Sequence, residues 1–284
     1  MTPSMALQES GSDPNHVPKT VFSLASLTPY IWLVETTAML IITADDYGKS
    51  QLATDTILTC FANGRVTSAS AMVFMEDSRR AARLAAEAGM EVGLHLNFTL
   101  AFNGPVAKDL RKHQDKAIRY LTRNKLSQVL YNPFLAQSFE YLARSQEDEF
   151  RRLYGKGPIF YNGHHHMHLC ANVLVKKLIP GGARIRRSFT FGPREKGGIN
   201  RLYRNVVDRV VERRFVTTDS FFSVEPVKDS ERLRRILSRA ETETVEVEVH
   251  PEIWEESGFL LSDDFRDVLG SVPLGGFGVL QGRS

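Results

Sequence analysis

Short apolar runs alternate with amphipathic stretches along most of the chain, a pattern typical of strands followed by helices. The strands that it predicts are Leu40–Thr43, Val66–Val73, Glu91–Asn97, Ile159–Tyr161, Ala183–Ile185, Asp219–Val224, Thr244–His250 and Phe277–Leu280. The helices that it predicts are Gln51–Asn63, Asp77–Ala88, Phe139–Tyr154, Ala171–Ile179, Ile199–Arg214, Asp229–Ala240 and Asp263–Leu269. Alternation on this scale predicts an α/β fold, with a parallel sheet covered by helices.

Two segments depart from this pattern. Residues 1–38 contain Ser, Pro, Thr and Asn without a clear period and lack the basic start and long apolar core of a signal peptide. We expect them to form a disordered extension, so that the folded domain spans residues 39–284.

Residues 98–138 are also weakly periodic and contain Asn103-Gly104-Pro105 and several lysines. This segment is interpreted as an insertion or a lid-like loop region that covers a site.

Polar residues stand at the carboxyl ends of four predicted strands. They are Asp45 with Asp46, His95, His164 and His250. Pattern alone is compatible with a barrel or with a doubly wound sheet. In a β/α barrel the carboxyl ends converge on one mouth, where active sites are found. The convergence favours a single distorted (β/α) barrel with fewer than eight complete units and its active site at those strand ends.

Four of the chain's eight histidines fall within five positions, in the segment Y-N-G-H-H-H-M-H-L at Tyr161–Leu169. Imidazole is neutral near pH 7 and binds metals strongly. In an extended conformation His164, His166 and His168 share one face, and His165 points to the other. The segment therefore predicts part of a metal site whose other ligands come from elsewhere in the chain.

The remaining strand ends offer those ligands. Asp45 and Asp46 are adjacent, so on an extended chain they point in different directions, and one can bind metal while the other acts as a base. His95 lies between two leucines, and His250 precedes Pro251, which fixes the local backbone. An ion held by one Asp and two His keeps open positions at which water is activated and a carbonyl is polarised. With a carboxylate base and a histidinium acid, such a site suits hydrolysis of an amide or ester.

The composition of the chain limits the kinds of binding partner and cellular location that we expect. The chain is 42% hydrophobic with a net charge of only +3, which suits a globular protein. Its basic runs, Arg184–Arg187, Arg201–Arg214 and Arg232–Arg239, have the spacing of solvated helix faces, so no nucleic-acid partner is expected. Cys60 and Cys170 form no C-x-x-C pair, which fits a reducing, cytoplasmic location. No apolar stretch approaches the roughly 18–20 residues of a membrane span.

From about Leu40 to the C-terminus the chain resembles the YdjC-like carbohydrate deacetylases, a group that includes chitooligosaccharide deacetylases and hopanoid-biosynthesis-associated proteins. The motifs that carry this resemblance are T-A-D-D-Y-G at Thr43–Gly48, G-R-V-T-S-A-S at Gly64–Ser70, G-L-H-L at Gly93–Leu96, H-H-H-M-H at His164–His168 and V-H-P at Val249–Pro251. Each motif alone is weak, but together and in this order they are specific.

The resemblance implies a distorted barrel that binds one divalent metal ion, Mg or Zn, and removes N-acetyl groups from a sugar or glycolipid. It implies that the metal ligands are Asp46, His95 and His164. By the same matching, Asp45 is the general base and His250 protonates the departing amine. The residues that it implies line the site or support the ligands are His166, His168, Asn162 and one of Arg186 and Arg187. Members often form dimers, so a homodimer is a further expectation.

The chain also departs from the family. The family often has Asp-Ser before the first histidine of the cluster, whereas this chain has Asn162-Gly163. Residues 98–138 match no family segment, and since such loops often set substrate choice, the resemblance does not specify the sugar. Two alternatives stay open: another metal-dependent amidohydrolase or phosphoesterase on a β/α barrel, and an inactive barrel that binds metal or carbohydrate. Asp45 favours an enzyme, because a binding protein needs no base beside its metal.

Overall fold

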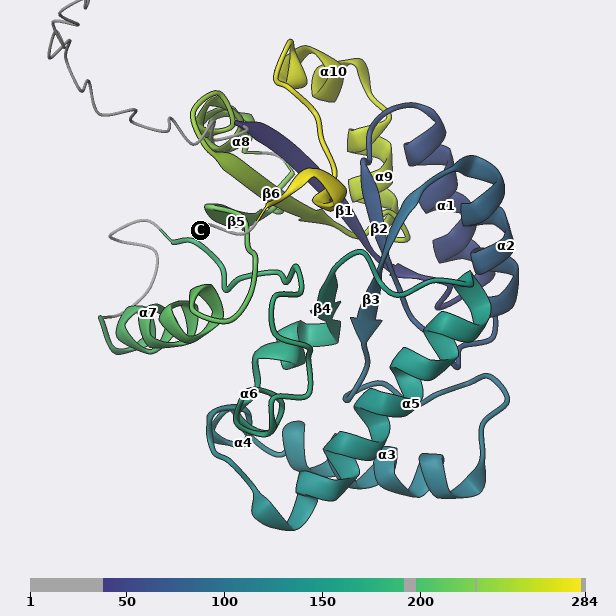
Figure 1. Cartoon of the computed structure of the whole chain (residues 1–284). Helices are drawn as coiled ribbons and strands as arrows, with labels where there is room; N and C mark the ends of the chain where they lie inside the picture. Colours follow the sequence, from purple (N-terminus) through teal and green to yellow (C-terminus); the bar gives the residue numbers. More distant parts are fainter. Residues whose placement is uncertain (1–37, 192–197, 228, 282–284) are drawn as a thin grey trace, which may run out of the picture. The chain divides into compact units, whose positions relative to one another are not determined.

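Six parallel strands form one curled sheet in the order β4-β3-β2-β1-β6-β5 (Figure 1). They are β1 Met39–Tyr47, β2 Ser68–Ala71, β3 Glu91–Leu96, β4 Tyr161–Gly163, β5 Ser220–Ser223 and β6 Thr244–Val249. The computed structural model describes residues 38–191, 198–227 and 229–281. All but the last residue of the expected extension 1–38 lies outside these ranges. The α/β fold with a parallel sheet is therefore confirmed.

Helices connect the strands. They are α1 Gln51–Ala62, α2 Ser78–Ala88, α3 Lys108–Leu121, α4 Leu126–Val129, α5 Ala136–Tyr154, α6 Ala171–Lys176, α7 Gly198–Glu212, α8 Ser230–Arg239, α9 Trp254–Leu260 and α10 Asp263–Leu269. Three short 3₁₀ turns are η1 Pro133–Leu135, η2 His164–Leu169 and η3 Phe277–Val279. Local signals set several boundaries: Ser50 caps α1, and left-handed Gly89 and Gly155 end α2 and α5. None of the described helices has the length and apolar character needed to cross a membrane.

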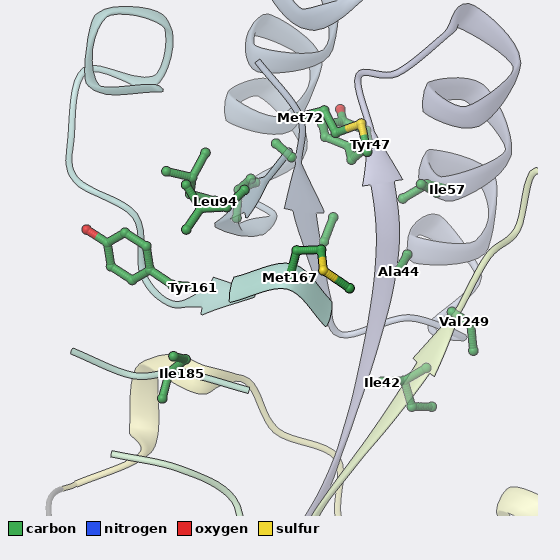
Figure 2. Packing of buried hydrophobic residues seen from close by; sticks show 14 of the residues in the cluster. Ile42, Ala44, Tyr47, Ile57, Met72, Leu94, Tyr161, Met167, Ile185 and Val249 are labelled. Carbon is green, nitrogen blue, oxygen red and sulfur yellow. The ribbon is translucent and has the colours of Figure 1, made fainter. Parts of the chain in front are cut away.

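Strand β1 lies in the middle of the sheet and shows how its two faces differ. Leu40, Ile42 and Ala44 belong to the large core that the helices cover. Figure 2 shows part of this core, with Ile57 of α1 directed at β1. The alternate residues, from Met39 to Asp45, point to the inner, concave face. Every residue of β1 is buried, because both faces of the sheet are covered.

The amino end of the inner face is closed by an apolar cluster, which we call the base cluster. Its buried members are Met39, Ile41, Phe160, Phe277 and Leu280. The rings of Phe160 and Phe277 stack with their centroids 4.0 Å apart. Turn η3, in the yellow C-terminal part of Figure 1, contributes Phe277. The opposite, carboxyl end of the inner face, where Asp45 lies, is called the mouth.

The prediction of a distorted barrel with fewer than eight units is confirmed only in part, because no strand of the described residues joins β4 to β5. The predicted strand Ala183–Ile185 instead makes isolated bridges that span the gap. Tyr161 N–H donates to the Arg184 carbonyl at 2.9 Å, and Ile185 N–H donates to Val216 at 2.8 Å. The predicted strand Phe277–Leu280 is also wrong, since η3 occupies it. The structure is a curled half-barrel with a short bridging segment.

Residues 98–138 are mainly helical, so the expectation of a loop there was wrong. Helix α3 buries Leu110, Gln114, Ala117 and Leu121, at the spacing of one helical face. This face packs on α5 (Figure 1). The exposed lysines and arginines around it dilute the pattern, which explains why sequence periodicity missed the helix. Helix α9, directly after His250, was also missed because it is only seven residues long.

Candidate metal and catalytic site

Three of the predicted ligands come together at the mouth. Asp46 Oδ1 lies 3.2 Å from His95 Nε2 and 3.1 Å from His164 Nδ1. One donor atom from each residue lies within 4.8 Å of the other two, a spacing that one metal ion can bridge. The side chains of Asp46 and His95 are buried, and that of His164 is 14% exposed. One carboxylate and two imidazoles therefore fit a divalent cation that is reached from the mouth.

An irregularity in β1 separates the two adjacent carboxylates. The pairing with β2 shifts register between Ala44 and Tyr47, and Asp46 adopts a left-handed φ of 66°. A bulge of this kind re-aims a side chain at a strand end. Asp45 consequently stays on the inner face, while Asp46 turns toward His95 and His164. The strained backbone at Asp46 is consistent with a functional constraint.

The orientation of His95 is fixed from behind by Asn162. The Asn162 amide donates to Asp45 Oδ1 at 3.1 Å, so its own oxygen faces His95 Nδ1 at 2.8 Å. His95 must then carry a proton on Nδ1, which leaves Nε2 as the nitrogen that faces Asp46 and that could ligate a metal once it is unprotonated. Asn in place of the family's Asp thus still supplies the acceptor. At the next position a Cβ on Gly163 would lie 2.9 Å from the Leu96 carbonyl oxygen, so the close backbone approach requires glycine.

Asp45 is held as a carboxylate by a two-pronged ion pair. Arg186 Nη1 and Nη2 donate to its two oxygens at 2.6 and 2.9 Å, and Ser70 Oγ donates at 2.7 Å. Burial by itself would raise the pKa of Asp45, but the charges of Arg186 and His95 outweigh burial and hold the pKa well below its usual range. Asp45 is therefore ionised and oriented across the physiological pH range.

Two buried glutamates, which the sequence reading missed, share the same arginine. Arg186 Nε donates to Glu246 at 2.8 Å and Nη1 donates to Glu248 at 3.0 Å. Burial raises the pKa of both carboxyls despite this arginine. The run V-E-V-E-V in β6 was the available signal, but alternation does not say which face is inside. Here the valines face the helices and the glutamates face the inner surface. Arg187, by contrast, pairs with Asp208 and Glu212 of α7.

The histidine cluster does not continue β4. The strand ends at Gly163, and His165 and His166 have left-handed φ values of 52° and 59° in η2. The expected alternation of faces is therefore wrong. His165 does not point away from His164, because the two rings stack with centroids 4.1 Å apart. His165 Nδ1 also lies 3.2 Å from Thr99 Oγ1.

His166 and His168 occupy different environments. His166 Nε2 lies 3.8 Å from Glu248 Oε1, and its ring contacts Phe189 and Phe221. His168 is fully buried and donates from Nε2 to the Arg186 carbonyl at 3.0 Å. Burial lowers the pKa of His168 to about 3, so the ring is neutral at physiological pH. The contacts of His168 thus hold the backbone of Arg186.

The segment after β6 completes the mouth. His250, directly after β6, has a side chain that is 31% exposed, and its backbone N–H donates to Glu256 Oε2 at 2.6 Å. Lys49, which the sequence reading missed, donates to Asp46 Oδ2 at 3.0 Å and also to Glu252. Glu252 and Lys49 therefore connect the segment that carries His250 to the outer oxygen of Asp46.

Comparison with known proteins shows the family of this chain. The model of the YdjC-like protein family matches residues 39–270. This chain belongs to the YdjC-like family. A carbohydrate deacetylase of Danio rerio is 29% identical over 137 residues, 47% of this chain and 43% of that protein. A chitooligosaccharide deacetylase of Yersinia pestis (strain Pestoides F) is 29% identical over 138 residues, 48% of this chain and 52% of the relative. The matches thus span about half the length of these curated relatives.

A solved structure shows the same fold at lower identity. It is the crystal structure of a candidate cellobiose-phosphate cleavage protein from Enterococcus faecalis V583, with a TM-score of 0.60 and 17% identity. The similarity covers 84% of this YdjC-like chain and 97% of the other. At that identity the comparison establishes a shared fold alone.

In this YdjC-like chain the structure gathers most of the predicted site residues at one mouth. Asp46, His95 and His164 lie together, and Asp45, Asn162 and Arg186 stand directly behind them. His166 and His250 lie to the side, and His168 supports the backbone instead of facing the three donor residues. The residues that sequence reasoning missed are Ser70, Lys49, Glu246, Glu248, Glu252 and Glu256.

Proposed function

We propose that this chain is a metal-dependent carbohydrate deacetylase, which hydrolyses the acetamide of an N-acetylated sugar. The observation that carries the proposal is the set of metal donors on Asp46, His95 and His164 beside the ionised Asp45. Membership of the YdjC-like family and the names of the curated relatives support carbohydrate as the substrate class. Residues 98–138 contribute the wall beside His165 and are proposed to select the sugar.

The residues that would hold the ion are Asp46, through its carboxylate, His95, through Nε2, and His164, through Nδ1. The mixed nitrogen and oxygen donors suit Zn²⁺, whereas Mg²⁺ prefers oxygen ligands. When bound, the ion would supply a Lewis acid for the acetyl carbonyl and would lower the pKa of a water molecule toward neutrality.

Asp45 and His250 divide the proton transfers. Asp45 accepts a proton from the attacking water as the water oxygen bonds to the acetyl carbon. Arg186 keeps Asp45 ionised and oriented by its two-pronged contact. The carbon–nitrogen bond then breaks, and the imidazolium of His250 donates its proton to the leaving nitrogen. The products are acetate and a sugar amine.

Acetate release from a panel of N-acetylated glycans and glycolipids, measured with the metal-loaded protein, tests the proposal. Asp45→Asn keeps the shape of the side chain and removes the base, so we expect kcat to fall by about 10²- to 10⁴-fold while the metal stays bound. Normal turnover by this variant would rule out the assigned base. Phosphate release from sugar phosphates without acetate release would indicate a phosphoesterase, and binding without turnover would indicate an inactive carbohydrate-binding protein.

A further inference from the structure

Glu256 is a buried carboxylate beside the candidate acid His250. It lies on α9 and is 1% exposed. Its Oε2 accepts the backbone N–H of His250 at 2.6 Å. Its Oε1 lies 3.8 Å from His250 Nδ1 and has no hydrogen-bond partner among the described residues. One oxygen of this carboxylate thus holds the backbone of His250, and the other stands next to the ring.

A buried carboxylate oxygen without a partner is unfavourable, so its surroundings should offer a donor. The His250 ring, whose Nδ1 lies 3.8 Å away, can provide one. The distance of 3.8 Å is too long for a hydrogen bond, but a small rotation of the imidazole shortens it, and such contacts often tighten only when substrate binds. Pro251 fixes the backbone that follows, which restricts the ring to few orientations.

We propose that Glu256 is a positioning residue for His250. It accepts a hydrogen bond from Nδ1–H and thereby directs Nε2 at the departing nitrogen. In this arrangement Nε2 carries the proton that is transferred, and Glu256 stabilises the imidazolium before the transfer. The proposal rests on the proposed function, because it assigns His250 its partner in the same reaction.

Other charges act around this pair. Asp45 of β1 couples electrostatically to His250 and to Glu256, and Glu225, after β5, and Glu248 of β6 act on Glu256. All of them are acidic, and burial together with their charges raises the pKa of Glu256. Glu256 differs from the rest because it alone is recorded within 4 Å of a His250 ring nitrogen among the described residues. It is therefore the residue that can select the tautomer.

Glu256→Gln separates the two contacts of this side chain. Glutamine still accepts the His250 backbone N–H through its oxygen, but its amide cannot accept a hydrogen bond from Nδ1–H. We expect kcat for acetate release to fall by about tenfold to hundredfold with KM unchanged, by analogy with the loss of a hydrogen-bond partner that orients a metal-binding histidine. Glu255→Gln, at the exposed neighbouring position, is the matched control and should behave like the wild type.

The tautomer of His250 provides a readout that does not depend on turnover. In ¹⁵N-histidine-labelled full-length protein, with His250→Gln used for assignment, we expect Nδ1–H in the wild type and a shift toward Nε2–H in Glu256→Gln. An unchanged tautomer would overturn the proposal, as would a shifted tautomer with unchanged kcat in an active enzyme. If the wild type released no acetate from any substrate, the proposed function would fail, while the tautomer would still decide whether Glu256 sets the His250 ring.

Discussion

The two ends of the inner face are built on the same strands but differ in composition. At the amino end, Met39 and Ile41 of β1 join the base cluster, whose members are all apolar and buried. Further along β1, Thr43 and Asp45 lie on the same face as Ile41. Asp45 there pairs with Arg186. The base therefore gains stability by burying apolar surface, whereas the mouth buries charges that must be paired to be tolerated.

Because of this difference, substitutions at the base and at the mouth should affect different properties: the stability of the fold and the chemistry of the site. A change in the base cluster should lower the unfolding free energy and leave the chemistry of the folded protein intact. A change in the metal donors should remove function and leave the fold intact. Arg186 should affect both stability and function, because it pairs with Asp45 and also with the two buried glutamates, Glu246 and Glu248. The following changes test this separation, from the largest expected effect to the smallest.

The largest effect is expected from His164→Ala. Removing one of three ligands should weaken metal binding by about a hundredfold or more, since even residues that only orient ligands change it by 10- to 100-fold. Metal content after dialysis, measured by elemental analysis, and Kd by competition with a chelator would show the loss. His165→Ala is the matched control: it removes the stacked neighbour and should leave metal content near that of the wild type. Equal losses in both variants would remove His164 from the ligand set.

Arg186→Met should cost about 3–5 kcal/mol of unfolding free energy, because it leaves buried carboxylates without their partner. It should also lower kcat, since Asp45 loses the group that orients it. Urea denaturation and acetate-release kinetics measure the two effects. Arg187→Met, one position along, removes an arginine whose carboxylate partners Asp208 and Glu212 are 14% and 48% exposed, so water can replace part of the lost pairing and the cost should be smaller. Similar costs for both variants would contradict the central place given to Arg186.

Phe277→Ala should destabilise the protein by about 3–5 kcal/mol through the cavity that it leaves in the base cluster. Because Phe277 is far from the mouth along the strands, kcat should stay within about twofold of the wild type at temperatures where the variant is folded. Thermal unfolding and kinetics at 20 °C test this pair of expectations. Val279→Ala, in the same turn but 53% exposed, should change stability little. A large fall in kcat for Phe277→Ala would show that the base also shapes the site.

The smallest effect concerns pH. The folded state lowers the pKa of His168 from 6.5 to about 3, so between these values the unfolded state binds more protons. Unfolding free energy should therefore fall as the pH is lowered below about 6.5, by at most about 1.4 kcal/mol per pH unit for this one group. His168→Gln, which can still donate to the Arg186 carbonyl, should flatten that slope. Urea denaturation from pH 7.5 to 5 measures it, and an unchanged slope would mean that His168 is not buried as a neutral ring.

Local sequence signals predicted much of the fold. The boundaries of β3, β6, α1, α2 and α10 follow the predictions within one or two residues, because caps, glycines and apolar runs define them locally. The elements that failed depend on distant partners. Ala183–Ile185 has strand character but pairs only at single positions, and α3 is recognisable only once the face that packs on α5 is known.

In the candidate site, too, some features could be predicted from local sequence and others depend on distant residues. The sequence by itself determined the donor types and their place near the carboxyl ends of strands, and the family motifs then singled out Asp46, His95 and His164. Only the tertiary structure decided which groups surround them. Alternation in β6 cannot reveal that Glu246 and Glu248 point inward, because both faces of a covered sheet are buried. The pairing of Arg186 with Asp45 joins residues 141 positions apart, and the curled sheet creates their proximity. The left-handed backbone of η2 and the contact of Glu256 with His250 are local, but they depend on turns that the pattern of apolar and polar residues does not reveal.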